Sequence, residues 1–222
     1  QNKVLHWLID EEKDGGLGYI YLGNLEDQDN TPVKEDLLKK NLQKRGYTKD
    51  QISKAVNELV SKASNQAGSL YQINKEVYSL LRYGKQGVKD ENRNRQTVHY
   101  IDWDNVDNND FYVAEEVSVL CFNQVERKRP DVVLYINGIA LGVFELKRSC
   151  VSIGEGIRQN LTNQKKEYIQ NFFSTAQFLF AGNEAEGLKY GTIETPEKYY
   201  LNWKEDNKAT DELSAAVKSI QS

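Results

Sequence analysis

Hydrophobic residues in the first 95 positions recur at helical spacing. Four of them fall on one face of a helix that ends at Gly46, namely Val33, Leu37, Leu38 and Leu42. Thr48 and Gln51 form a capping-box pair before the next apolar stripe, which consists of Ile52, Ala55, Val56, Leu59 and Val60. Helical character continues from Asn74 to Leu81. Residues 1–95 are therefore predicted to be mainly helical, and the glycine-rich stretch 16–23 is predicted to be a turn between strands.

The pattern changes at about Val98 to short apolar or alternating runs, which favour β-strands. These runs are 97–102, 111–122, 131–136, 139–146 and 175–182. Ser152 and Glu155 form a second capping-box pair that predicts a helix through Phe172, and a last helix is predicted from Thr210 to Ile220. The order of elements predicts a single domain over 1–222 with an α/β (α+β) fold. A mixed sheet of four or more strands flanked by helices would occupy 96–222 with a C-terminal extension, after an N-terminal helical annex.

Two of the predicted strands form a hairpin around Asn137-Gly138, within the stretch RPDVVLYINGIALGVFELKRS at 129–149. Its apolar runs are bracketed by Asp131 at one end and by Glu145 and Lys147 at the other. Charges at such positions need a partner or a metal, because desolvating them alone costs several kcal/mol. The other two Glu-x-Lys pairs, Glu11-Lys13 and Glu126-Lys128, occur in charged surroundings, where we expect them to be solvated.

The length of the turn decides whether the two carboxylates can meet. A two-residue turn would send Asp131 and Glu145 to opposite faces of the hairpin. A three-residue loop of 136–138 would pair Tyr135 with Ile139 and would bring both carboxylates to one face. We predict this loop or an equivalent β-bulge. The competing interpretation is a structural ion pair at a sheet edge in an unrelated α+β domain.

Two carboxylates and a lysine suit the hydrolysis of phosphodiesters. Mg²⁺ is bound by one or two carboxylates together with waters and phosphate oxygens, and Mn²⁺ takes similar ligands. Such a metal lowers the pKa of a bound water and stabilises charge on the attacked phosphate. A lysine can orient that water or neutralise the developing charge. Asp131 and Glu145 are therefore candidate metal ligands, and Lys147 is a candidate catalytic residue.

The helix predicted after the hairpin carries one stripe whose members are spaced by 4, 4, 3 and 4: Ile153, Ile157, Leu161, Gln164 and Tyr168. Gln164 and Tyr168 could reach the mouth of the hairpin and join the site. Alternatively, the stripe ends in amphipathic residues at the surface. Spacing alone leaves both interpretations open.

Composition restricts the classes of function. The chain has 39% hydrophobic and 28% charged residues, and no apolar run approaches the roughly 20 residues that span a bilayer. A net charge of −4 argues against nucleic-acid binding through bulk positive charge, although basic residues cluster locally, as at 127–129. Cys121 and Cys150 belong to no metal-binding pattern and are expected to be buried free thiols. With no signal-peptide pattern at the N-terminus, these features predict a cytoplasmic protein with no membrane contact.

Three segments resemble the PD-(D/E)xK nuclease domain at the N-terminus of the R subunit of type I restriction enzymes (HsdR). They are 100–119, 128–149 and 181–206. The most specific features are RPD-x-x-x-x-x-N-G and E-L-K-R, followed by Q-x-x-x-Y at 164–168, and the likeness extends from about residue 42 onward. The resemblance implies a mixed sheet flanked by helices and Mg²⁺-dependent, non-specific cleavage of double-stranded DNA.

The resemblance also implies roles for individual residues. Asp131 and Glu145 would hold the metal, and Lys147 would act on the attacking water. Gln164 and Tyr168 match an element that supports the site or contacts DNA. A further acidic ligand often comes from an upstream helix in such proteins, and two residues are candidates for it here, Glu76 and Glu116.

The family resemblance concerns one module of a larger machine. The sequence contains no G-x-x-x-x-G-K-[ST] loop for ATP, which only the translocase part of such a subunit would use. The chain is therefore expected to be the nuclease module of a longer subunit, whose partners are DNA and the methylation and specificity subunits. The alternative is a catalytically decayed domain that binds DNA or a partner. The joint presence of Asp131, Glu145 and Lys147 argues against decay.

Overall fold

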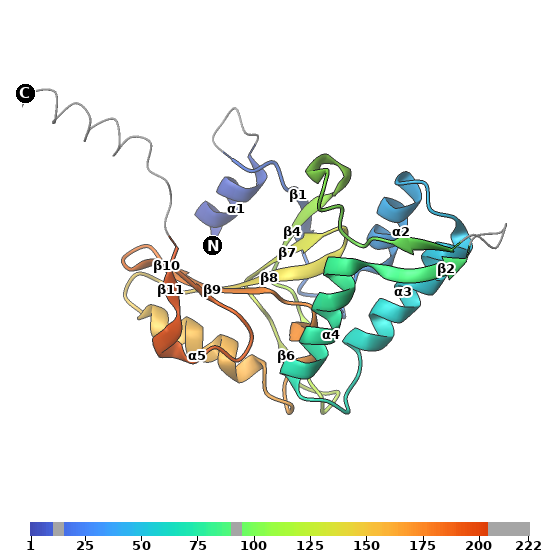
Figure 1. Ribbon diagram of the computed structural model, residues 1–222. Coiled ribbons are helices and arrows are strands. Elements are labelled where there is room, and N and C mark those ends of the chain that lie inside the picture. The colour runs from blue at the N-terminus through green and yellow to red at the C-terminus, as the bar shows by residue number, and fades with distance from the viewer. Residues whose placement is uncertain (11–15, 90–94, 204–222) are drawn as a thin grey trace, which may run out of the picture.

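A seven-stranded mixed β-sheet forms the centre of the computed structural model, which describes residues 1–10, 16–89 and 95–203. Its strands are β1 (Ile20–Asn24), β4 (Phe111–Glu115), β7 (Val132–Ile136), β8 (Ile139–Leu146), β9 (Phe178–Asn183), β10 (Gly187–Gly191) and β11 (Leu201–Asn202), adjacent to one another in that order. β1 runs parallel to β4 and β8 runs parallel to β9, whereas the other neighbours are antiparallel. A mixed sheet with helices packed against it confirms the predicted fold class (Figure 1).

The helical annex consists of α2 (Glu35–Lys44), α3 (Lys49–Ala63) and α4 (Leu70–Tyr83). The predicted capping box is present, because the Thr48 side chain accepts the backbone N–H of Gln51 and the Gln51 side chain accepts that of Thr48. The apolar faces of the three helices pack on one another and on a second sheet, formed by β2 (Lys85–Lys89) and β3 (Arg95–Val98). Ile139 of the central hairpin joins this cluster, so the annex is packed directly on the main sheet.

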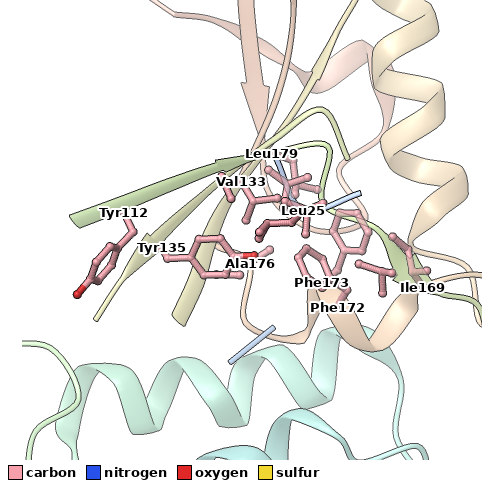
Figure 2. Close-up of a cluster of buried hydrophobic side chains, with 14 of the residues drawn as sticks. Leu25, Tyr112, Val133, Tyr135, Ile169, Phe172, Phe173, Ala176 and Leu179 are labelled. Carbon is pink, nitrogen blue, oxygen red and sulfur yellow. The ribbon is translucent and has the colours of Figure 1, made fainter. Parts of the chain in front are cut away.

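A larger core lies between one face of the sheet and the short 3₁₀ segment η3 (Gln170–Ser174). Figure 2 shows Val133, Tyr135 and Leu179 projecting from the strands toward Phe172 and Phe173. Burying a phenylalanine this completely stabilises the fold by about 3–5 kcal/mol relative to alanine. The side-chain amide of Asn74 on α4 also donates to the carbonyls of Ser174 and Ala176, at 3.0 and 2.8 Å. These contacts hold the chain after α5 against the annex.

The opposite face of the sheet is covered by α1 (Asn2–Ile9), which buries Leu5 and Leu8. The rings of Phe144 and Phe180 stack beneath it with centroids 4.3 Å apart. Helix α5 (Ile153–Asn163) lies on the other side, against β8 and β9 (Figure 1). Alternate residues of β8 therefore face α1 or α5, and Glu145 falls on the α5 side.

Several predicted elements differ from the structure. Helix α5 ends at Asn163 rather than at Phe172, because the following residues turn so that Ile169 and Phe172 enter the core. The stretch predicted as a turn at 16–23 contains most of β1, whose partner β4 lies about 90 residues further along the chain. Cys121 is buried as predicted, but Cys150 is exposed.

Two sequence predictions lie outside the described residues, namely the helix from Thr210 to Ile220 and the pair Glu11-Lys13. Among the helices of the described ranges, none has the length and apolar character needed to cross a membrane.

Candidate metal and nuclease site

The hairpin of β7 and β8 turns in two residues, and a bulge further along corrects its register. Asn137 and Gly138 both have positive φ, at 53° and 86°, and Ile136 pairs with Ile139. The predicted three-residue loop is therefore wrong. However, pairing shifts by one residue at Leu141, which lies between the partners of Tyr135 and Leu134. This is the equivalent bulge that the sequence analysis allowed.

The bulge brings the two carboxylates to one face. Beyond Leu141, Val133 pairs with Val143 and Val132 pairs with Phe144. Extending this register by one residue places Asp131 opposite Glu145. Directly opposed residues on antiparallel strands project to the same side. A hairpin with the same turn and no bulge would place the two side chains on opposite faces. The hairpin thus meets the geometric condition for a shared metal ion.

Glu145 is fully buried and incompletely satisfied. Its Oε1 accepts a hydrogen bond of 3.3 Å from Asn163 Nδ2, and its Oε2 has no hydrogen-bond partner within the described chain. Lys147 Nζ lies 3.8 Å from that Oε2, an ion-pair distance that is too long for a hydrogen bond. Burial raises the pKa of Glu145 well above its usual value, and the Asp131 carboxylate raises it further, whereas the Lys147 charge opposes both effects.

Asp131 is partly buried at the start of β7. Its Oδ2 accepts a hydrogen bond of 2.6 Å from the backbone N–H of Leu146. Burial raises the pKa of Asp131, and the Leu146 hydrogen bond and the Lys147 charge partly offset that increase. Two carboxylates with raised pKa values, one of them carrying an unpartnered buried oxygen, are an unfavourable arrangement that a divalent cation would relieve.

Lys147 is held in place by helix α5. Its backbone N–H donates to the carbonyl of Gly182 on β9 at 2.8 Å, and its Nζ donates to Gln159 Oε1 at 2.5 Å. The helix can approach this closely because of Gly156. A Cβ at that position would lie only 3.1 Å from the carbonyl oxygen of Glu145.

Gln159 and Asn163 are the helix residues that contact the site, and neither was predicted from the sequence. They are four residues apart and therefore lie on one face of α5, beside the apolar stripe that the analysis followed. The sequence feature that could have identified them is a polar pair at i and i+4 immediately next to a buried apolar stripe. It was not distinctive, because exposed helix faces carry such pairs routinely.

Gln164 and Tyr168 do not lie on a common helix face, because α5 ends at Asn163. The Gln164 amide donates to the carbonyl of Asn160 and accepts the backbone N–H of Glu194, at 2.9 and 2.6 Å. It therefore joins the end of α5 to a neighbouring loop, and both of these hydrogen bonds are to backbone groups rather than to the carboxylates. Tyr168 contacts no carboxylate of the site in the described structure, but its ring lies beneath Lys128 Nζ, 4.4 Å from the centroid.

The two candidates for a further acidic ligand occupy different places. Glu76 lies on α4, where it pairs with Lys62 at 2.8 Å. Glu116 follows β4 with a φ of 50°, and its backbone N–H donates to the carbonyl of Asp131. Its charge contributes to the raised pKa of Glu145, although its own carboxylate is paired with Arg129 at 2.7 Å. Of the two, Glu116 is the one beside the site.

Two carboxylates form the core of the candidate metal site. No cluster of three or more His, Cys, Asp or Glu side chains suited to a metal occurs among residues 1–10, 16–89 and 95–203. This donor set agrees with Mg²⁺, which takes one or two protein carboxylates and completes its shell with waters and phosphate oxygens. It does not suit a closed structural zinc site, which needs four protein ligands.

A groove of about 810 Å³ opens beside α5 and Lys147, and we call it the α5 groove. Most of the residues that line it are polar or charged, and they include Lys128, Lys147, Glu155, Arg158, Gln159, Thr162 and Asn163. Lys128 was expected to be solvated with Glu126, but it is half-buried in this lining. The groove gives an extended polar substrate access to the lysine of the site.

Comparisons with known proteins identify the family of the chain. The family described as type I restriction enzyme R protein N terminus matches residues 8–198. A Methanocaldococcus jannaschii protein named as the endonuclease subunit of a type I restriction enzyme is 27% identical over 157 residues. That match covers 68% of this chain but only 14% of the archaeal protein. Because the family match covers most of the sequence, the chain belongs to the family of type I restriction enzyme R protein N-terminal domains.

Proposed function

We propose that this chain is a metal-dependent endonuclease module that hydrolyses phosphodiester bonds of double-stranded DNA. One observation carries the proposal: Asp131 and Glu145 share a face beside Lys147, and Glu145 Oε2 is buried without a hydrogen-bond partner in the described chain. A structural ion pair would satisfy that oxygen, whereas a cation site leaves it free. The catalytically decayed alternative has no observation of its own in its favour.

The two carboxylates would hold Mg²⁺, for which Mn²⁺ is a possible substitute. When bound, the metal supplies a more acidic water and stabilises negative charge on the phosphate. Asp131 is oriented for this task by the N–H of Leu146, and Glu145 is oriented by Asn163. Each carboxylate therefore keeps at least one oxygen outside these hydrogen bonds.

Lys147 would act on the phosphate and on the attacking water. One of the three N–H groups of the Lys147 ammonium donates to Gln159, which leaves the other two for substrate. A positive charge fixed at the groove stabilises the negative charge that develops on the phosphate as the bond breaks. The partly buried setting strengthens this interaction relative to bulk water.

The wider biological role is part of the same proposal. The matched part of the chain covers only 14% of the archaeal relative, so any ATP-driven translocation would belong to other parts of a full-length subunit. We propose that such a subunit joins methylation and specificity subunits, which would select the DNA sequence, and that it acts in the cytoplasm. The two free cysteines fit that location.

A calorimetric titration with Mn²⁺ tests the metal site. The parent chain is expected to bind, and Asp131→Asn and Glu145→Gln are expected to lose binding while remaining folded. Glu76→Gln removes a carboxylate from an ion pair between α3 and α4 and should bind like the parent. Equal binding by all four chains would show that the hairpin carboxylates hold no metal and would remove the basis of the proposal.

Cleavage of plasmid DNA by the same chains tests the chemistry. Lys147→Gln is expected to retain Mn²⁺ binding and to lose about 10²–10⁴-fold in cleavage rate, the usual contribution of a catalytic proton-transfer or charge-stabilising group. An unchanged rate in Lys147→Gln would exclude the role assigned to the lysine.

A further inference from the structure

Three basic side chains line the α5 groove, and they differ in whether a carboxylate already neutralises them. Lys147 pairs with Glu145, and Arg158 binds both Glu155 and Glu197 at 2.8 and 2.9 Å. Lys128 forms no ion pair with any residue in the part of the chain that the structure describes. Of these three cations, Lys128 is therefore the one whose charge no carboxylate of residues 1–10, 16–89 or 95–203 pairs with.

The neighbours of Lys128 make this contrast sharper. Lys128 is the middle residue of the run Arg127-Lys128-Arg129, in which both arginines are paired. Arg127 binds Asp29 at 2.5 Å, and Arg129 binds Glu116 at 2.7 Å. Because successive residues of an extended chain point to opposite sides, the arginines turn toward these carboxylates while Lys128 turns into the groove.

Tyr168 holds Lys128 without neutralising it. The ammonium group lies over the aromatic ring at 4.4 Å from its centroid, a distance typical of a cation–π contact. The ring is itself well anchored, since the next residue, Ile169, is buried in the core shown in Figure 2. The carbonyl of Tyr168 also accepts the backbone N–H of Phe122 at 3.0 Å. A lysine held in this way keeps its full charge for a ligand in the groove.

We propose that Lys128 contacts the phosphate backbone of the DNA duplex and that Tyr168 is the residue that positions it. The inference rests on the nuclease function proposed above and places the path of the substrate along the α5 groove. A backbone phosphate supplies an anion for Lys128, since the one carboxylate residue that lines the groove, Glu155, is paired with Arg158. Such phosphate contacts fix the register of a protein on DNA without reading its sequence. This agrees with a module that leaves sequence recognition to other subunits.

Binding of a fluorescently labelled DNA duplex, followed by anisotropy without divalent metal between about 50 and 200 mM salt, tests the proposal. Lys128→Gln is expected to weaken binding about five- to tenfold for any sequence and to lower the slope of log K against log salt by about 1. Lys165→Gln is the matched control, because it removes the same charge from an exposed position in the turn after α5 that does not line the groove.

Variants of Tyr168 test the positioning role. Tyr168→Phe keeps the aromatic ring and should behave like the parent, whereas Tyr168→Leu should reproduce the loss of affinity and of salt slope seen in Lys128→Gln. Combining Lys128→Gln with Tyr168→Leu should give no further loss, because the two residues act as a unit. A Tyr168→Leu chain that keeps the parental salt slope would show that the ring does not position the lysine.

The inference and the nuclease proposal fail separately. Two results would overturn the phosphate contact while leaving Mn²⁺ binding intact. One is equal DNA affinity and equal salt slope in Lys128→Gln and Lys165→Gln. The other is a parent chain that does not bind the duplex. Failure of the nuclease proposal would appear in the metal titration of the parent chain, whatever the DNA result. Lys128→Gln itself should bind Mn²⁺ like the parent.

Discussion

The carboxylate of Asp131 accepts the backbone N–H of Leu146, the residue next to Glu145, across the β7–β8 hairpin. This one hydrogen bond joins the two strands at the point where the apolar pattern gives way to charge. It orients Asp131 beside Glu145 and opposes the increase that burial causes in the pKa of Asp131. The protein thereby holds two carboxylates on one face of the hairpin, and in metal-free protein this should have a measurable thermodynamic cost.

Glu145→Gln should stabilise the metal-free protein at neutral pH. The folded-state pKa of Glu145 is raised above its ordinary value of 4.5, so the native chain binds more protons than the unfolded chain between those two values. The free energy of unfolding of the parent should therefore fall as pH rises through that interval. Glutamine does not ionise, so the variant should not show this decrease. Thermal unfolding should show the difference, with each kcal/mol raising Tm by about 2–4 °C.

The pH dependence distinguishes this effect from a general improvement in packing. The gain from Glu145→Gln should be largest above the raised pKa and should vanish below pH 4.5, where the parent carboxyl is protonated in both states. Saturating Mn²⁺ should stabilise the parent and not the variant. A gain of equal size at low and neutral pH would show that desolvated charge is not its cause.

Gln159→Ala should weaken catalysis without weakening the fold. Its Oε1 accepts the Lys147 ammonium at 2.5 Å, so truncation frees the lysine to adopt other rotamers. We expect cleavage to fall about 10–100-fold, as for other residues that orient a catalytic group, with unchanged Mn²⁺ affinity. The measurement is the cleavage rate at saturating metal. A variant that cleaves at the parental rate would mean that Lys147 needs no orientation from α5.

Gln164→Ala should show the opposite behaviour. Gln164 is buried, and removing its amide leaves the N–H of Glu194 without its acceptor. We expect a loss of about 1–3 kcal/mol in the free energy of unfolding, measured in urea, with Mn²⁺ affinity unchanged. Gln159→Ala is the natural control, since Gln159 lies on α5, the helix at whose C-terminal end Gln164 is located. Loss of metal binding in Gln164→Ala with parental stability would return Gln164 to the site.

Asn137→Ala should be among the more damaging substitutions in the hairpin. Asn137 is fully buried at a φ of 53°, its Nδ2 donates to the carbonyl of Tyr100, and its Oδ1 accepts the N–H of Asp110. Losing these bonds and placing alanine at positive φ should cost about 3 kcal/mol or more.

Asn137→Gly separates the two contributions. Glycine tolerates the positive φ, so it should recover about 1 kcal/mol of the alanine loss and retain the part that comes from the hydrogen bonds. Equal unfolding free energies for the alanine and glycine variants would mean that backbone strain at the turn is negligible.

Much of the architecture could be predicted from local sequence patterns. The stripe and capping box that begin at Thr48 specify α3, because propensity, cap and apolar face all act within one segment. The strand character of β7 and β8 and the turn at Asn137-Gly138 follow equally from neighbouring residues. The candidate residues Asp131, Glu145 and Lys147 could be selected because charge at the end of a buried strand is unusual.

The remaining features depended on contacts between distant segments. The apolar run of β8 has no alternation to reveal the bulge at Leu141, although that single residue decides whether Asp131 and Glu145 share a face. The end of α5 is decided by burial of Ile169 and Phe172, so the helical spacing of Gln164 and Tyr168 was misleading.

The sequence by itself therefore determined most of the segments that become helices and strands, and it determined which side chains are able to do chemistry. Only the tertiary structure decided which of those side chains meet. Gln159 contacts Lys147 because α5 approaches β8 closely over Gly156. Lys128 lies over the ring of Tyr168, a residue from a distant segment that packs against the core. The physical reason is that periodicity and capping are local, whereas register, close approach and burial arise from packing between parts of the chain that no local pattern relates.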